Sequence, residues 1–425
     1  MKESKYKSKY KEEKKVTDKI YWLTNARLES GYQVDNGVIT GTNTKCCHLL
    51  IEDGKIAKIV SSDETIADDL PKKDVKQLLV LPSFIEKHCH LDKTMLGDRW
   101  RSVTPVNSIF ERLEIEKEVV PNLETTTQER AEKLLDIYLK SGVTHVRTHV
   151  DLYPEVGLKN LEEVQKALQT FEGKLSYEIV AFPQHGLLRT RAKNLVRESL
   201  RQGVSFVGGV DPATVDGDIE ASLQEMVELA VEGNAGIDLH LHDTDQLGLF
   251  TIKRLAQLTK EAGLQGKVAI SHAFALGDIP PSEAEEMAEL LADAGITIIT
   301  SVPLDIKFPP VGILHRKGVS VAVGCDNIFD VWSPFGNGDV LERVNRLAEI
   351  SNWSDERSLG QALQFITDGK TPLNSEGNQV WPQIGDEASI VFVEASCSAE
   401  AVARRSKRVA TMFKGKIVSG SLDSK

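Results

Sequence analysis

The middle of the chain alternates between short apolar runs and longer segments of helical periodicity. The apolar runs are β-like and lie near residues 84–88, 143–149, 177–182, 205–209, 236–240, 268–272, 296–300 and 320–324. Segments between them, such as Ile219–Glu232 and Pro281–Ala294, have the length and charge pattern of surface helices. Strands that alternate with helices are typical of βαβ units and a parallel sheet. Eight such repeats predict an α/β fold, a closed (β/α)8 TIM barrel, and periodicity alone leaves a doubly wound open sheet as the alternative.

The two ends of the chain have a different pattern, in which short β-like runs are separated by turn signals such as Asp53-Gly54. These runs are Ile20–Leu23, His48–Ile51, Ile56–Ile59 and Leu78–Leu81 near the start, and Ala388–Val393 and Val409–Val418 near the end. We therefore predict that residues 20–80 and 375–425 join as one small β-sandwich domain, and that residues 81–374 form the barrel. Residues 1–19 are polar and rich in lysine, and we expect them to form an N-terminal extension.

Composition and charge narrow the range of functions. A barrel of ~250 residues plus an accessory domain accounts for the 425 residues of the chain. The net charge of -12 disfavours binding to a nucleic-acid backbone and fits a small neutral substrate better. No stretch approaches the ~20 apolar residues of a membrane helix, and the chain start lacks the apolar region of a signal peptide. Since the five cysteines also suggest no disulfide framework, we expect a cytoplasmic protein without nucleic-acid or membrane partners. The oligomeric state stays open, with a homo-oligomer as one option.

Polar residues with metal-binding chemistry follow several of the predicted barrel strands. His88-Cys89-His90 ends the first strand, His240 the fifth, His272 the sixth, and Asp326 follows the eighth. The carboxyl ends of barrel strands carry the active site, and alternate residues of a strand face the same side. Any one of these histidines could be an ordinary buried residue, but together they form a nitrogen and oxygen ligand set suited to Zn or Fe. The pattern therefore predicts a metal site.

Four sequence motifs resemble the amidohydrolase superfamily, and within it bacterial cytosine deaminase. They are Pro82–Asp92, Gly142–Asp151, Ile179–Gln184 and Gly324–Trp332, and the similarity extends over most of residues 80–345. The chain is also similar to N-isopropylammelide aminohydrolase. This resemblance implies a TIM-barrel hydrolase that contains one divalent metal ion, Zn or Fe, with Mn as a further option.

The resemblance also implies a role for each site residue. His88, His90, His240 and Asp326 would be the metal ligands, and His272 would orient or deprotonate the attacking water and stabilise the developing oxyanion. Asp326 would accept a proton, and Asp243 would be the proton shuttle. Gln184 would bind the ring amide of the substrate, and Trp332 would form an apolar wall over the ring. From the residues alone, a helix cap for Gln184 and ordinary core packing for Trp332 are the favoured interpretations.

Three positions depart from the cytosine deaminase pattern. Asp243 stands where the family has a glutamate, which is one methylene longer. Lys93 and Asn327 also differ from the deaminase, and these changes predict a pocket adapted to another heterocycle or amide. No lysine ends the fourth strand, where the members that bind two metals carry a carboxylated lysine, so we expect one ion.

These observations predict a hydrolytic deaminase that acts on a small N-heterocycle, such as a cytosine-like pyrimidine, a triazine or a related ring. Two other hydrolytic reactions stay open, namely release of a substituted amine and opening of a cyclic amide. A third alternative is a barrel that binds a ligand without catalysis, because the barrel fold alone does not imply activity.

Overall fold

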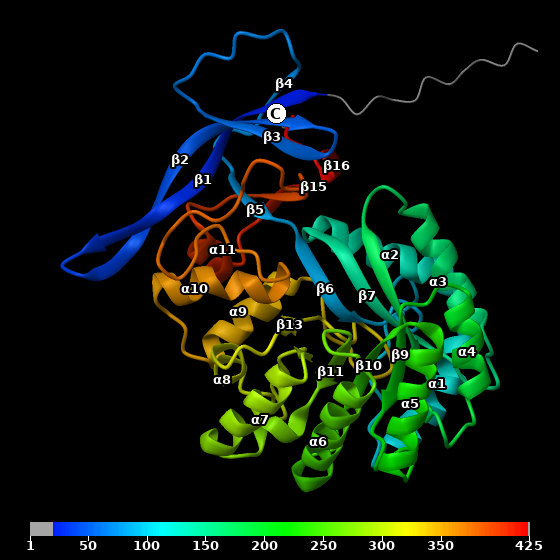
Figure 1. Cartoon of the computed structure of the whole chain (residues 1–425). Coiled ribbons are helices and arrows are strands. Elements are labelled where there is room, and N and C mark those ends of the chain that lie inside the picture. Colours follow the sequence, from blue (N-terminus) through cyan, green and yellow to red (C-terminus); the bar gives the residue numbers. More distant parts are fainter. Residues whose placement is uncertain (1–19, 424–425) are drawn as a thin grey trace, which may run out of the picture.

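The computed structural model describes residues 20–423, and the predicted extension at residues 1–19 lies outside the described residues. The chain forms two sheets, one from the middle of the sequence and one from both ends (Figure 1). The end-derived sheet lies at one side of the barrel, and its two parts join where Leu79–Pro82 pairs with Ile390–Val393.

The central sheet has eight parallel strands that follow one another in sequence order. They are β6 (Phe84–Cys89), β7 (Val143–Asp151), β8 (Ser176–Phe182), β9 (Phe206–Val210), β10 (Gly236–Leu241), β11 (Val268–His272), β12 (Ile296–Thr300) and β13 (Val321–Val323). A parallel bridge between Cys89 and Asp326 joins the first strand to the segment after the last. The predicted (β/α)8 barrel is therefore confirmed, with each strand within a few residues of its expected place.

Helices follow the barrel strands and cover the outside of the sheet (Figure 1). They are α2 (Thr127–Lys140), α3 (Lys159–Thr170), α4 (Lys193–Arg201), α5 (Ile219–Gly233), α6 (Asp245–Glu261), α7 (Pro281–Asp293), α8 (Val311–Arg316) and α9 (Val340–Ile350). α5 is typical, because Leu223, Met226 and Leu229 are buried at helical spacing against the strands. Asp218 caps its first turn, and Asn234 ends it in a left-handed conformation.

Shorter helices complete the chain. α1 (Ile109–Val119) and η1 (Val120–Asn122) lie in the long connection after β6, and η2 (Phe274–Gly277) follows β11. α10 (Glu356–Ala362) and η3 (Leu363–Ile366) follow the barrel in sequence and precede the last strands of the end-derived sheet, and α11 (Ser398–Arg404) lies between two of those strands.

The second sheet combines strands from both chain ends, as predicted. It contains β1 (Tyr21–Asp35), β2 (Val38–Glu52), β3 (Lys55–Ser61), β4 (Lys72–Asp74), β5 (Leu79–Pro82), β14 (Ile390–Val393), β15 (Arg408–Phe413) and β16 (Lys416–Gly420). Its strands form one hydrogen-bonded path in the order β16-β15-β14-β5-β1-β2-β3, with β4 beside β1. The hairpin of β1 and β2 is much longer than the sequence pattern indicated. It turns at Asn36-Gly37, where both residues have the positive φ that a tight hairpin turn requires.

Among residues 20–423, no helix is both long enough and apolar enough to cross a membrane. The cytoplasmic location, the domain boundaries and the oligomeric state stay predictions.

Candidate active site

The barrel brings the five residues of the predicted metal site together at the carboxyl ends of its strands. His88 and His90 come from β6, His240 from β10 and His272 from β11, while Asp326 follows β13. The Nε2 atoms of His88 and His90 lie 3.4 Å and 3.3 Å from Oδ1 of Asp326. The ring of His240 lies 4.6 Å from that of His88, and Nε2 of His272 lies 4.0 Å from Oδ2 of Asp326. Residues separated by more than 200 positions thus converge on one point.

Unmet hydrogen-bonding capacity marks this cluster as a place for a metal ion. Nε2 of His88, Nε2 of His272 and both ring nitrogens of His240 are buried and have no hydrogen-bond partner among the described residues. Buried polar atoms are rarely left unpaired in a folded protein. Ligand atoms of His88, His272 and Asp326 lie close enough to one another to hold one ion, and so do those of His88, His149 and His240. The cluster could therefore hold a metal ion.

The protonation states of the cluster also suit metal binding. Burial and the nearby Lys93 ammonium lower the pKa of His90 to about 4. Burial likewise lowers the pKa of His240 and of His272 well below the ordinary value. For Asp326 burial opposes ionisation, but the neighbouring rings of His88 and His90 outweigh it and lower the pKa of the carboxyl group. Neutral imidazoles beside an ionised carboxylate are the forms that bind a divalent cation.

Two of these residues have a backbone conformation that non-glycine residues seldom adopt. His272 has φ of 71° and Asp326 has φ of 60°. The amide of Asp326 donates a hydrogen bond to the carbonyl of His88 over 2.7 Å and helps to hold this geometry. Such strain concentrates at functional sites, because the surrounding structure must enforce it.

A narrow pocket of about 40 Å³ opens onto the cluster. Its lining includes the predicted substrate residues Gln184 and Trp332, together with Lys93, Asn327 and His242. The structure thus places Gln184 and Trp332 beside the candidate metal ligands, and their substrate contacts stay predictions.

A buried ion network supports the wall of this pocket. Nζ of Lys93 donates to both carboxylate oxygens of Asp151 over 2.9 Å and 3.0 Å, and to Gln184. It also lies 3.4 Å from Glu116, which accepts a hydrogen bond from the indole of Trp332. Burial opposes the charge of Glu116, but Lys93 outweighs it and lowers the pKa of Glu116 to about 2. Lys93 therefore connects Gln184 and Trp332 and fixes both side chains.

Glu116, Asp151 and His185 form another buried group whose ligand atoms lie close enough to hold an ion. The Lys93 ammonium already supplies the positive charge between the two carboxylates. This group is therefore better described as an ion pair network than as a second metal site.

The predicted proton shuttle Asp243 lies just after β10, next to the cluster but outside the lining of the narrow pocket. Its Oδ1 accepts a hydrogen bond from Thr214, and its Oδ2 is buried without a partner. Burial raises the pKa of its carboxyl group. The preceding residue, His242, does line the pocket. Nδ1 of His242 lies 2.9 Å from Oδ2 of Asp211, and its ring stacks on that of His272 at 4.4 Å.

Sequence comparisons now place these features in a family. A model of the amidohydrolase family matches residues 191–419, more than half of the chain. The chain belongs to the amidohydrolase family. The protein is thus a hydrolase that acts on carbon–nitrogen bonds, in agreement with the sequence prediction.

Individual relatives of this amidohydrolase cover almost the whole chain. The Escherichia coli (strain K12) protein YahJ is 41% identical over 411 residues, 96% of this chain and 89% of the relative. The crystal structure of N-isopropylammelide isopropylaminohydrolase from Burkholderia multivorans is similar, with a TM-score of 0.82 and 29% identity over 94% of this chain and 98% of that one. The 5-methylcytosine deaminase of Klebsiella pneumoniae, liganded with phosphonocytosine, has a TM-score of 0.76 and 25% identity over 94% and 98% of the two chains.

Sequence reasoning missed three features of this amidohydrolase site. His149 was part of a quoted motif but was not assigned a role, and its ring lies 4.3 Å from His88 and 4.4 Å from His240. Asp211 directly follows β9, and the sequence pattern predicted no role for it. Glu116 lies in α1, far from any strand end, and no sequence signal connects it with Lys93.

Proposed function

We propose that this amidohydrolase catalyses the hydrolytic deamination of a small N-heterocycle and that it depends on one divalent metal ion, Zn or Fe, with Mn as a further option. The observation that carries the proposal is the convergence of His88, His90, His240 and Asp326, whose imidazole nitrogens include several buried atoms without partners. Similarity to N-isopropylammelide isopropylaminohydrolase and to 5-methylcytosine deaminase supports a heterocyclic substrate.

Each site residue has a proposed part in the reaction. When bound, a divalent ion supplies a Lewis acid that makes water nucleophilic near neutral pH. Asp326 accepts the proton of the attacking water, and His272 orients that water and stabilises the developing oxyanion. A new carbon–oxygen bond forms at the ring carbon, the exocyclic carbon–nitrogen bond breaks, and the nitrogen leaves as ammonia after it has gained a proton.

Gln184 and Trp332 hold the ring. Because Oε1 of Gln184 accepts a hydrogen bond from Lys93, the amide NH₂ group of Gln184 stays available to donate to a ring carbonyl. Glu116 and Lys93 limit the movement of both side chains. We propose that this support fixes the orientation of the ring against the metal ligands.

The proton that reaches the leaving group has two candidate carriers. The family resemblance implies Asp243, whose carboxyl group has a raised pKa and one unpartnered oxygen. Pocket lining and the contact with His272 favour His242, which Asp211 orients. General acid–base catalysis requires a group within hydrogen-bond reach of the reacting atoms, so the two candidates can be separated by mutation.

The proposal is tested by a product assay on metal-reconstituted protein. Purified protein is loaded with Zn, Fe or Mn, its metal content is measured, and ammonia release is followed over a panel of aminated pyrimidines, triazines and pterins. We expect one equivalent of metal per chain and ammonia release from at least one ring. Two equivalents, or no bound metal after reconstitution, contradict the proposed site.

A second candidate reaction is the release of a substituted amine, which the similarity to N-isopropylammelide isopropylaminohydrolase favours. The same panel, extended with N-alkylated rings, distinguishes it because an alkylamine and not ammonia accumulates. Opening of a cyclic amide would give neither product. A silent ligand-binding barrel would bind metal without turning over any ring.

We further propose that cytosine itself is a poor substrate. Lys93 and Asn327 line the pocket, and Asp243 is shorter than the glutamate of cytosine deaminase. Cytosine deamination with kcat/KM of ~10⁴ M⁻¹s⁻¹ or more, which is ordinary for an enzyme, would contradict this. The cytoplasmic location and a homo-oligomeric state remain part of the proposal.

A further inference from the structure

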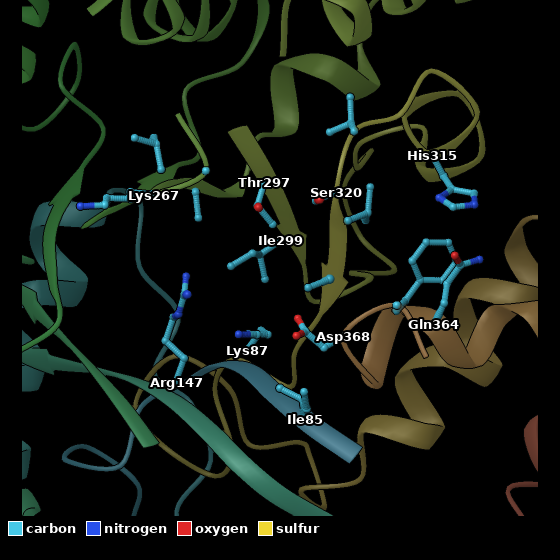
Figure 2. Close-up of a pocket in the computed structure, with 18 of the residues that line it drawn as sticks. Ile85, Lys87, Arg147, Lys267, Thr297, Ile299, His315, Ser320, Gln364 and Asp368 are labelled. Atoms are coloured by element: carbon cyan, nitrogen blue, oxygen red, sulfur yellow. The ribbon is translucent and has the colours of Figure 1, made fainter. Parts of the chain in front are cut away.

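A second and larger cavity lies at the opposite end of the barrel. It has a volume of about 600 Å³, and its lining includes Phe206 and Val268, the first residues of β9 and β11, together with Lys87 and Arg147 from the middle of β6 and β7. Figure 2 shows Arg147 and Lys87 pointing into this hollow, near Asp368. None of the predicted metal ligands lines this cavity.

One lining residue begins a chain of hydrogen bonds that leads to the metal site. Nη1 of Arg147 donates to Oδ2 of Asp238 over 2.9 Å. Oγ of Ser271 donates to Oδ1 of Asp238 over 2.7 Å, and Nδ1 of His88 lies 2.8 Å from the same Oγ. All four side chains are buried, with exposures of 7% for Arg147, 0% for Asp238 and Ser271, and 1% for His88. The chain crosses the barrel interior through side chains of four strands, β7, β10, β11 and β6.

The hydrogen bonds of this chain determine where the proton of His88 lies. A carboxylate can only accept, and a serine hydroxyl has a single proton to donate. Because Ser271 gives that proton to Asp238, it can only accept from His88, so Nδ1 of His88 carries the hydrogen. Nε2 of His88 then carries a free lone pair. This atom lies 3.4 Å from Asp326 and has no hydrogen-bond partner among the described residues.

We infer that Arg147, Asp238 and Ser271 are positioning residues that fix the tautomer and orientation of His88 for metal binding, and that the relay can be reached from the cavity at the far end of the barrel. The inference rests on the proposed metal site. Hydrogen bonds to the second nitrogen of a metal-ligating histidine raise its basicity, and their loss typically weakens metal affinity by about 10- to 100-fold. The negative charge of Asp238 acts on His88 through Ser271, and Arg147 balances that charge.

A purely structural role for the relay predicts a loss of stability and no loss of metal affinity. Buried ion pairs are often no more stabilising than apolar side chains of the same volume. A purely structural role for the Arg147–Asp238 pair would also leave unexplained why the relay ends on His88, whose Nε2 faces Asp326. Metal affinity is therefore the property that separates the two explanations.

The first test uses Ser271→Ala and Asp238→Asn. Affinity for Zn is measured by competition with a chelator, and the thermal unfolding of each metal-free protein is recorded in parallel. Ser199→Ala and Asp339→Asn are matched controls, because Ser199 is a buried serine in α4 and Asp339 is a buried acid paired with Arg408. We expect the relay variants to bind Zn about 10- to 100-fold more weakly and the controls to match the wild type within about threefold. Relay variants that fold and bind Zn as tightly as the controls would overturn the inference.

The second test asks whether a small cation that enters the cavity can replace the side chain of Arg147. Arg147→Ala should weaken Zn binding, and millimolar guanidinium should restore it by entering the cavity and pairing with Asp238. Urea, which has a similar shape and no charge, should not restore it. A folded Arg147→Ala protein whose affinity guanidinium leaves unchanged would show that the relay is not reached from this side. If Arg147→Ala does not fold, the test uses Arg147→Lys, which keeps the charge and should retain most of the affinity.

These outcomes are distinguishable from failure of the proposed function. A wild-type protein that binds no divalent ion refutes the proposed metal site itself. A wild-type protein that binds Zn but deaminates no ring refutes the proposed reaction and leaves the relay open to both tests. Only equal Zn affinities of wild-type and relay variants count against the relay alone.

Discussion

The two ends of the barrel differ in what their buried polar atoms do. At the carboxyl end, imidazole nitrogens of His88, His240 and His272 face one another without hydrogen-bond partners around a pocket of about 40 Å³. At the amino end, the lining of a cavity of about 600 Å³ includes Glu178, which forms ion pairs with Arg147 and Lys87. The larger hollow therefore does not mark the reaction site. The smaller pocket marks the reaction site, because its buried imidazole nitrogens lack a hydrogen-bond partner among the described residues and buried polar atoms are rarely left without one.

The same contrast extends to the acids at the two ends. Burial raises the pKa of Asp330, beside the narrow pocket, to about 7. At the other end burial also opposes ionisation of Glu178, but His145, Arg147 and Lys87 outweigh it and lower its pKa. At the carboxyl end, burial therefore disfavours the ionised form of Asp330, as is common in active sites. At the amino end, the partners of Glu178 favour its ionised form.

The largest expected difference between substitutions at the two ends is in the amount of bound metal and in the turnover rate. His88→Ala or Asp326→Ala removes a proposed ligand, and we expect turnover to fall to the background rate while bound metal is lost. Lys87→Ala is the matched control, because Lys87 is the neighbour of His88 on β6 but lines the opposite cavity. We expect Lys87→Ala to keep one metal equivalent and most of the activity. Metal analysis with a product assay checks both, and full activity in His88→Ala would exclude the proposed ligand set.

The proton carrier gives the next largest effect. Asp243→Asn, His242→Gln and Asp245→Asn are compared on whichever substrate the panel identifies, with metal content measured in each. Loss of a general acid typically costs about 10²- to 10⁴-fold in rate, so the true carrier should lose that much and keep its metal. Asp245 begins α6 and serves as the local control. If Asp243→Asn stays within about threefold of wild type while His242→Gln collapses, the shuttle position implied by the resemblance is displaced by one residue.

The sequence predicts the site residues that lie on strands better than those in the loops that follow them. The eight barrel strands were predictable because buried parallel strands are continuous apolar runs, and His88 and His90 were predictable because alternate strand residues share a face. β10 ends at Leu241, so the orientations of His242 and Asp243 follow from loop contacts with Asp211 and Thr214 and not from strand alternation.

Two other features depend on contacts that no local pattern encodes. The part of the β1–β2 hairpin near its turn is largely exposed, so the full length of the hairpin left little hydrophobic signal. Ser271 meets His88 across 183 positions of sequence, and Lys93 meets Asp151 and Gln184 across 58 and 91. Only the register of the closed barrel brings these side chains together.

Replacement of the buried acid at the carboxyl end tests the electrostatic side of the comparison. Asp330 accepts hydrogen bonds from the side chain of Asn327 and from the amides of Trp332 and Ser333, while the charges of Lys93 and Arg112 also act on it. Because its pKa is about 7 in the folded protein and the ordinary value for an aspartate is 3.8, the folded state binds more protons between these limits. Wild-type stability should therefore fall relative to Asp330→Asn as pH rises from about 4 to 7, by on the order of a few kcal/mol. Urea unfolding at several pH values measures this, and parallel pH profiles for the two proteins would contradict it.

The smallest expected effect has the opposite pH dependence and belongs to the amino end of the barrel. The pKa of Glu178 is lowered, so its ionised form stabilises the folded protein above pH 4.5, the ordinary pKa of a glutamate. That contribution is lost as pH falls towards the pKa in the folded protein. Because the Glu178 side chain is 27% exposed and solvent screens its ion pairs, we expect Glu178→Gln to cost only about 1 kcal/mol at pH 7. The difference from wild type should shrink below pH 4.5, where Asp330→Asn should show its largest disadvantage. Glu163→Gln, which removes a surface pair with Lys166, is the control, and Zn affinity should stay within about threefold of wild type in both variants. A Glu178→Gln protein that loses turnover while its stability is unchanged would mean that Glu178 acts on the active site, through its contact with Arg147, and not only on the fold.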